Sequence, residues 1–148
     1  VGQGVLAIAS DGDVPQPTLQ QIERLLSVVG HVHQLPERLI DAVTGLSGSG
    51  PGFVAMVVEA LADGGVLAGL PRPLAQQLAI QTLAGTAALL EATGEHPASL
   101  RDRVASPAGT TIAGIATLER MGLRAALIDA VKAATDRATE LAGELAGR

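Results

Sequence analysis

The first forty residues carry a different pattern of apolar and polar positions from the rest of the chain. Two short aliphatic runs, residues 4–9 and 31–35, contain β-branched side chains and predict two buried strands. Between them, apolar residues recur at three- and four-residue spacing over residues 19–29, which predicts an amphipathic helix with Thr18 as its N-cap. Strand, helix and strand in this order predict one βαβ unit with parallel strands. Two strands are too few for a free-standing sheet, so we interpret the unit as the end of a larger doubly wound domain.

After about residue 38 the pattern is helical. Residues 39–43 lead into a segment rich in glycine and serine, residues 44–51, which we expect to be a loop. Further helices are predicted over residues 53–70, 73–92, 97–104, 112–121 and from 123 onward. Gly64 and Gly65 lie inside the first of these helices and should let another backbone approach closely.

The predicted helices have more apolar surface than one small domain can cover. The helix over residues 53–70 is apolar nearly all round, and the last helix repeats apolar residues every three or four positions. On its other face, the pairs Lys132/Asp136 and Glu144/Arg148 are opposite charges four residues apart. This pattern fits an ordinary bundle helix, and it also fits a helix that packs against a partner chain. Two long helices that are apolar on nearly every face favour the partner chain.

Composition narrows the kind of core and the kind of partner. The 148 residues are 47% hydrophobic, yet Phe53 is the only aromatic residue, so helices must pack closely through alanine and aliphatic side chains. A net charge of −5 and the lack of aromatic stacking surfaces argue against nucleic-acid binding. The chain has no cysteine, which excludes disulfides and zinc–thiolate sites and fits a cytoplasmic protein. Residues 73–90 are uncharged but include glutamine and threonine, so we expect a buried helix there and no membrane span.

Side chains of the usual catalytic kinds are sparse. His31 and His33 share one face of a predicted strand, but no further ligands are apparent near them, so we predict no metal site. His96 precedes a predicted helix, where we expect a local structural role. Two segments share a design, because residues 47–51 and 106–111 each place glycine and hydroxyl residues just before an apolar helix. The unpaired amides and partial positive charge of a helix N-terminus can hold a carboxylate or phosphate. Ordinary capping with turn glycines is the alternative interpretation.

A series of sequence blocks carries a resemblance to a known family. In order, the blocks are Asp41-Ala-Val-Thr-Gly-Leu-Ser-Gly-Ser-Gly-Pro51, Glu59-Ala-Leu-Ala-Asp-Gly-Gly65, Gly69-Leu-Pro71, His96-Pro97 and Ser106-Pro-Ala-Gly-Thr-Thr-Ile112. Their order and spacing resemble pyrroline-5-carboxylate reductase over about residues 1–145. The resemblance implies a mainly α fold: an all-helical dimerisation bundle, residues 37–148, preceded by a short βαβ remnant of a Rossmann-type α/β domain, residues 1–36.

The resemblance also implies a reaction, the last step of proline biosynthesis. A hydride would pass from NADPH or NADH to the C=N carbon of Δ1-pyrroline-5-carboxylate, giving L-proline. In the family, the segment matching residues 106–111 holds the substrate carboxylate through its backbone amides and serine, and the threonine matching Thr111 hydrogen-bonds the ring nitrogen. The segment matching residues 47–51 lies where substrate and nicotinamide meet. The implied catalytic residue is therefore Thr111, and the implied substrate-binding residues are Ser49, Ser106, Gly109, Thr110 and Thr111.

By the same resemblance the chain forms a homodimer through its helical domain, with the active site at the dimer interface and assembly of dimers into a decamer left open. No G-x-G-x-x-G segment is present, so we expect the main site for the dinucleotide phosphates to be missing and the chain alone to be inactive. Two residues depart from the family pattern: Ala108 replaces a glycine, and Gly52 stands where alanine is usual. Two alternatives remain, a non-catalytic helical dimerisation module and a reductase of another small acid with a similar helical domain.

Overall fold

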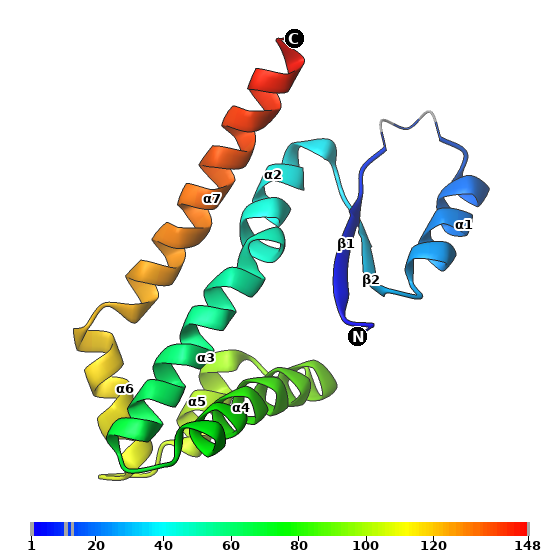
Figure 1. The fold of residues 1–148 in the computed structure, drawn as a ribbon. Helices are drawn as coiled ribbons and strands as arrows, with labels where there is room; N and C mark the ends of the chain where they lie inside the picture. Colours follow the sequence, from blue (N-terminus) through cyan, green and yellow to red (C-terminus); the bar gives the residue numbers. More distant parts are fainter. Residues whose placement is uncertain (1, 11, 13, 148) are drawn as a thin grey trace. The chain divides into compact units, whose positions relative to one another are not determined.

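The structure is a computed structural model, and it describes residues 2–10, 12 and 14–147. The elements in chain order are β1 (Gly4–Ile8), α1 (Gln16–Leu26), β2 (Gly30–Gln34), a 3-10 turn (Glu37–Leu39), α2 (Ile40–Val43), a π-helical turn (Thr44–Gly48), α3 (Gly50–Leu67), α4 (Arg72–Thr93), α5 (Pro97–Val104), α6 (Thr110–Arg120) and α7 (Leu123–Ala146) (Figure 1). The mainly helical fold with a short βαβ beginning is thereby confirmed. The chain divides into two compact units: the first contains the residues up to Pro51 and those from Ile128 onward, and the second contains Gly52–Leu127.

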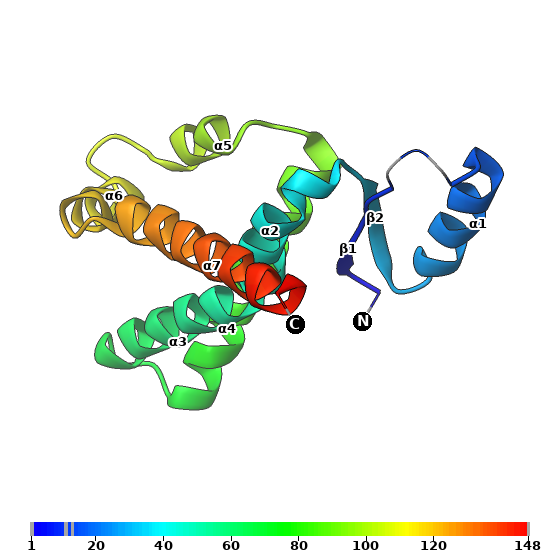
Figure 2. The same cartoon turned by 90° about the horizontal axis from the view of Figure 1, so that it is seen from above.

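The first unit begins with the predicted βαβ arrangement. β1 and β2 pair in parallel, in a register that runs from Gly4 opposite Gly30 to Ile8 opposite Gln34. Figures 1 and 2 show α1 along one side of this two-stranded sheet. A side chain at Gly30 would overlap the backbone of Gly4, so the close pairing at this end of the sheet requires glycine. Sequence periodicity therefore identified both strands and their parallel connection to within one residue.

The start of α1 differs from the prediction. The helix begins at Gln16, and Thr18 lies within its first turn, where its amide donates to the carbonyl oxygen of Pro15 at 2.9 Å. Thr18 is therefore not the N-cap. Pro17 explains the earlier start, because its fixed φ suits the first helical turn and its missing N–H would have no partner there. Of the predicted apolar stripe only Leu19 is buried, and Leu25 is 77% exposed.

The largest correction concerns residues 44–51, which are not a loop. Thr44–Gly48 form a π-helical turn between α2 and α3, closed by a hydrogen bond of 2.9 Å from the Ser49 amide to the Thr44 carbonyl oxygen. Pro51 lies in the first turn of α3, where a missing N–H is tolerated. The residue before it is Gly50, whose lack of a Cβ removes part of the clash that usually drives a pre-proline residue out of the helical conformation. Residues 37–67 are consequently one nearly continuous helical run.

The second unit is organised by alanine contacts between α3 and α4. Ala62, Ala75 and Ala79 are buried together, with the partly buried valines Val58 and Val66 packed against them. At Gly65 a Cβ would lie 3.1 Å from the Cβ of Ala75, whereas nothing lies within 4 Å of one at Gly64. The predicted close approach is confirmed at Gly65 alone, and the atom that approaches is a side-chain methyl of α4. Small side chains thus replace the aromatic core that the composition excludes.

The remaining helices end where glycine allows a left-handed residue. Gly94 follows α4 with φ of 63°, and Gly122 precedes α7 with φ of 76°. His96 has the local structural role expected of it, because its Nδ1 accepts a hydrogen bond of 3.2 Å from the amide of Ala98 at the start of α5. α6 begins at Thr110, two residues before the predicted start.

Charged side chains on the last helix pair largely as predicted. Lys132 and Asp136 form an ion pair of 2.6 Å on α7. Arg148 lies outside the described residues, so its predicted pair with Glu144 stays a prediction. Arg137 instead donates to Glu140 at 2.8 Å and to Glu144 at 3.2 Å, and these hydrogen bonds raise the pKa of Arg137 above its ordinary value.

Apolar side chains are sparsely covered by this chain alone. Among the described residues, the buried hydrophobic ones are Leu19, Ala62, Ala75, Ala79 and Leu100. Residues 37–67 have a mean hydropathy of 1.4 over an 18-residue window that is only 6% buried, so by length and composition this run resembles a membrane span. From the sequence, a membrane span was considered only for the uncharged residues 73–90. Because residues 44–51 are helical and do not interrupt the run, α3 belongs to a helical segment of 31 residues.

Candidate functional site

Residues 106–109 form a tight turn immediately before α6. The amide of Gly109 donates to the carbonyl oxygen of Ser106 at 3.0 Å, with Pro107 and Ala108 at the two central positions. Ala108 has φ of +58° and, within the described part of the chain, is the one residue other than glycine with positive φ. Proline followed by a residue of positive φ is the pattern of a type II turn, in which glycine is preferred at the second central position. The turn therefore keeps a glycine-type backbone around an alanine.

The start of α6 presents amides that no protein group accepts. The first amide bonded in the helix is that of Ala113, which donates to the carbonyl oxygen of Gly109 at 3.3 Å. No side chain caps this end of the helix. In the described ranges no acceptor faces the amides of Thr110, Thr111 and Ile112. The N-cap is Gly109, so both the anion site and the alternative, capping by a turn glycine, fit this helix start.

Hydroxyl groups surround the same amides. The hydroxyls of Ser106, Thr110 and Thr111 have no hydrogen-bond partner among residues 2–10, 12 and 14–147, and Thr111 is half-buried. One and a half turns further along α6, the Thr117 hydroxyl donates to the carbonyl oxygen of Ala113 at 3.3 Å, as helical threonines commonly do. At Gly109 a Cβ would contact the Ser106 hydroxyl oxygen and would lie 3.1 Å from the Ser106 carbonyl oxygen. Gly109 therefore leaves room for the Ser106 hydroxyl beside the free amides.

The other segment with this composition is built differently. Because residues 44–51 continue a helix, they supply no helix N-terminus, and the prediction of an anion site formed by free amides there is wrong. The Ser47 hydroxyl donates to the carbonyl oxygen of Val43 at 2.8 Å. The Ser49 hydroxyl is half-buried and has no partner in the part of the chain that the structure describes. Of the two serines, Ser49 is the one available to a ligand. The two segments belong to different compact units.

Sequence reasoning missed Gly45, which is buried in the π-helical turn. A Cβ at Gly45 would lie 2.8 Å from the amide nitrogen of Thr135 and 2.9 Å from the carbonyl oxygen of Val131, both on α7. One turn away, the Thr139 hydroxyl donates to the Asp41 carboxylate at 2.8 Å. The local sequence gave no signal of this contact, because Gly45 stands in a segment whose composition predicts a loop.

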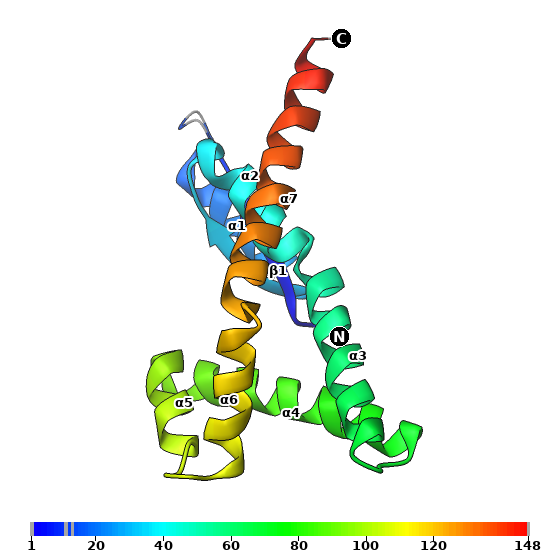
Figure 3. The ribbon, with the colours of Figure 1, turned by 90° about the vertical axis from the view of Figure 1, so that its left-hand side faces the viewer.

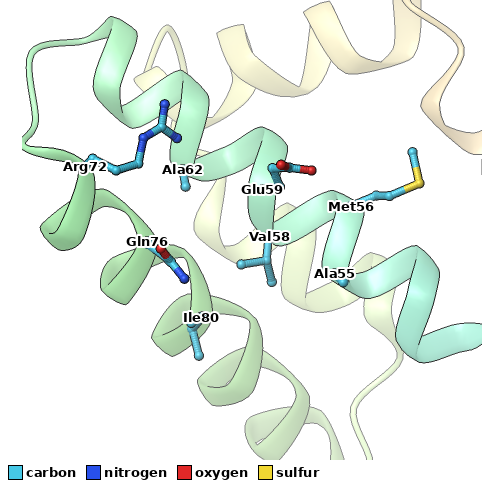
Figure 4. Close-up of a pocket in the computed structure, with 8 residues that line it drawn as sticks. All are labelled: Ala55, Met56, Val58, Glu59, Ala62, Arg72, Gln76 and Ile80. Atoms are coloured by element: carbon cyan, nitrogen blue, oxygen red, sulfur yellow. The ribbon is translucent and has the colours of Figure 1, made fainter.

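The second unit also contains a groove of about 750 Å³ between α3 and α4 (Figure 4). Its floor is aliphatic, and polar groups are found along its edges, where Arg72 forms an ion pair with Asp63. The lining residues are Ala55, Met56, Val58, Glu59, Ala62, Arg72, Gln76 and Ile80. Met56 is 69% exposed, so the groove continues into an uncovered apolar face of α3.

The chemistry available in these sites is binding and orientation. Residues 106–111 contain no titratable side chain, and they offer amide and hydroxyl donors to an anion and hydroxyl groups to a neutral polar atom. Among the described residues no three histidine, aspartate or glutamate side chains gather as a metal site. The arrangement suits a small carboxylate whose reacting partner comes from elsewhere.

Comparisons with known proteins were made over the whole chain. A family model described as pyrroline-5-carboxylate reductase dimerisation matches residues 37–141. Pyrroline-5-carboxylate reductase of Synechocystis sp. is 57% identical over 141 residues, which cover 95% of this chain and 53% of that protein. The enzyme of Pisum sativum is 45% identical over 95% of this chain and 52% of its own length. The chain therefore spans about half the length of the curated relatives it matches.

Solved structures of pyrroline-5-carboxylate reductases also match this chain. A pyrroline-5-carboxylate reductase from Coxiella burnetii matches with a TM-score of 0.90 and 33% identity over 95% of this chain and 52% of that one. The Plasmodium falciparum enzyme, solved with NADP bound, matches with a TM-score of 0.86 and 29% identity over 93% of this chain and 55% of that one. The fold of this chain therefore recurs in solved structures that align with 93–95% of it. From the family-model match and these identities, the chain belongs to the pyrroline-5-carboxylate reductase dimerisation family.

Proposed function

We propose that this chain is the substrate-binding and dimerisation part of an NAD(P)H-dependent reductase that converts Δ1-pyrroline-5-carboxylate to L-proline. In that reaction the C=N carbon gains a hydride from the cofactor and the ring nitrogen keeps or gains a proton, so the product is a cyclic amine. The observation that carries the proposal is the set of unpaired amides at the start of α6, beside the unpaired hydroxyls of Ser106, Thr110 and Thr111.

Each of these residues has a role that follows from its chemistry. The amides of Thr110 and Thr111, the Ser106 hydroxyl and the positive end of the α6 dipole bind the substrate carboxylate. Gly109 leaves the space in which that carboxylate and the Ser106 hydroxyl meet. The Thr111 hydroxyl hydrogen-bonds the ring nitrogen and orients the C=N bond, and Ser49 contributes a second hydroxyl. The chain then acts by fixing the substrate's orientation, and the cofactor supplies the reducing electrons.

The residues present do not fit the main dinucleotide site. The sequence contains no G-x-G-x-x-G, and the described βαβ unit lacks the glycine-rich turn that binds the diphosphate. The proposed mechanism therefore includes no step on a cofactor bound to this chain. A titration of the 148-residue chain with NADPH should show no tight binding, and tight binding would contradict this assignment.

A ligand-binding experiment tests the substrate site directly. L-Proline or a non-reducible analogue, added to the isotopically labelled dimer, should shift the amide resonances of Thr110, Thr111 and Ile112. Pyrrolidine, which keeps the protonated ring amine but lacks the carboxylate, is the control and should leave these resonances in place. If the carboxylate ligand leaves them unshifted, the substrate assignment is wrong and a non-catalytic dimerisation module becomes the better interpretation.

We also propose that a second copy of the chain covers the α3–α4 groove and that the enzyme acts as this homodimer in the cytoplasm. The family model's description and the uncovered apolar face of α3 support the dimer. Met56→Glu should shift the chain toward monomer in light scattering at micromolar concentration, because the dimer would bury an unpaired carboxylate. Met121→Glu is the comparison, since Met121 is 77% exposed at the end of α6 and does not line the groove. A dimer equally stable in both variants would contradict this placement of the interface. Assembly of dimers into a decamer is a further proposal that the same measurement on the wild type tests.

A further inference from the structure

The contact between the π-helical turn and α7 is closer than side chains normally permit. A methyl group at Gly45 would meet the Thr135 hydroxyl oxygen first, then the amide nitrogen of Thr135 at 2.8 Å and the carbonyl oxygen of Val131 at 2.9 Å. Two of these three atoms are backbone, so a side-chain rotation cannot make room for a methyl group. Only glycine fits this crossing.

A second contact fixes the direction of the crossing. The Thr139 hydroxyl donates to Asp41 at 2.8 Å, and Asp41 precedes Gly45 by one turn while Thr139 follows Thr135 by one turn. The two helical segments therefore run antiparallel, with one contact at each of two successive turns. Figure 3 shows α7 beside α2 along this seam, which we define by Asp41, Gly45, Thr135 and Thr139.

The seam holds the one π-helical turn in the described part of the chain. A π-turn contains one more residue than an α-turn, is rare, and is found frequently at functional sites. If Thr44–Gly48 relaxed to α-helical geometry, every side chain after the turn would rotate by about one residue relative to α7. Ser49 is the first residue beyond the turn, and its amide closes the π hydrogen bond to Thr44.

We propose that Gly45 is a positioning residue whose backbone contact with α7 maintains the π-turn and thereby sets the direction of the Ser49 hydroxyl toward the substrate. The inference rests on the proposed function, which places Ser49 at the substrate. The affinity for the imino acid then depends on the contact between Gly45 and α7, although Gly45 itself touches no ligand.

The test is a double-mutant cycle in the full-length enzyme, with Gly45→Ala, Ser49→Ala and the double variant. Gly45→Ala should raise KM for pyrroline-5-carboxylate at least about fivefold while KM for the cofactor changes less than twofold. In the Ser49→Ala background the same substitution should raise KM less than twofold, because the group it misplaces is gone. Gly143→Ala is the control, since Gly143 also lies on a helix of the seam and a Cβ there meets nothing within 4 Å.

Several outcomes would overturn the inference. An unchanged KM in folded Gly45→Ala, or equal effects of Gly45→Ala with and without Ser49, would show that the glycine serves stability alone. If Gly45→Ala does not fold, Thr139→Val replaces it in the cycle, with Thr139→Ser expected to restore KM because it keeps the hydrogen bond to Asp41. A wild type that reduces no pyrroline-5-carboxylate would contradict the proposed function separately. Amide hydrogen exchange would then test the role of Gly45 without activity. The Ser49 amide should exchange faster in Gly45→Ala, or in Thr139→Val if that variant replaces it, than in Gly143→Ala. Equal exchange rates would overturn the role of Gly45.

Discussion

Residues 44–51 and residues 106–111 are both rich in glycine and hydroxyl side chains, and each contains one proline shortly before or within the start of an apolar helix. In the first segment the amides are used in a continuous helical run, and a serine hydroxyl is left without a partner. In the second segment the backbone turns, and the amides of Thr110 and Thr111 as well as three hydroxyls are left without partners. The two segments therefore differ in whether their backbone can bind an anion.

The residue before each proline accounts for this difference. A proline ring crowds the Cβ of the preceding residue, which moves that residue away from helical geometry. Ser106 has a Cβ, so α5 ends before it and α6 must begin anew with unpaired amides. Gly50 has no Cβ and remains helical before Pro51. Composition alone describes the two segments as equivalent, whereas the presence or absence of a Cβ before the proline decides which of them begins a new helix with unpaired amides.

The largest effect is expected at the hydroxyl that the proposal places against the substrate. Thr111→Val in the full-length enzyme should lower kcat/KM by about 10- to 100-fold, the equivalent of a lost hydrogen bond to a charged group. Thr117→Val, on the same helix, removes a hydroxyl that is already bonded to Ala113 and should change kcat/KM less than twofold. Steady-state kinetics of the two variants would separate them, and equal kcat/KM values would remove Thr111 from the mechanism.

A smaller effect is expected where the turn holds the serine in place. Gly109→Ala should raise KM for the substrate by about tenfold, because the new methyl displaces the Ser106 hydroxyl and crowds the Ser106 carbonyl oxygen, removing about one hydrogen bond. Gly114→Ala adds a methyl to α6 where nothing lies within 4 Å, and its KM should match the wild type. In a Ser106→Ala background Gly109→Ala should lose most of its effect. A full tenfold increase in that background would show that the Ser106 hydroxyl is not what Gly109 accommodates.

These two predictions concern a segment that sequence reasoning located well. The end of α5 and a new helix start shortly after Pro107 were readable locally, because proline and glycine act on their immediate neighbours, whereas the sequence left open whether that start is capped. The parallel strands were readable as well, since two short aliphatic runs joined through an amphipathic helix specify them. The π-turn and the seam at Gly45 were not, because they depend on a contact with Thr139 that lies 98 residues away from Asp41. The local spacing of residues 44–51 gave no sign of that neighbour.

The pre-proline explanation can itself be tested by stability. Gly50→Ala should lower the free energy of unfolding by about 1–2 kcal/mol, part of the roughly 3 kcal/mol that proline costs within a helix, because it restores the clash with Pro51. Gly52→Ala should instead raise that free energy by up to about 1 kcal/mol from helix propensity. A Cβ at either position meets nothing within 4 Å, so packing does not distinguish the two. Urea unfolding of both variants measures the difference, and a stabilising Gly50→Ala would refute the explanation.

The smallest effect on stability is expected in residues 106–111, at Ala108, whose φ is positive. Ala108→Gly relieves a left-handed conformation that costs an ordinary residue about 1–2 kcal/mol, and it adds about 0.4–1 kcal/mol of entropy to the unfolded chain. The free energy of unfolding should therefore rise by roughly 0.5–1 kcal/mol, a shift in Tm of about 1–4 °C. Ala113→Gly, inside α6, should have the opposite sign because it pays the same entropy without relieving strain. Calorimetry of the pair tests this, since two destabilised variants would mean that Ala108 is unstrained and that the turn owes its shape to Pro107 and Gly109 alone.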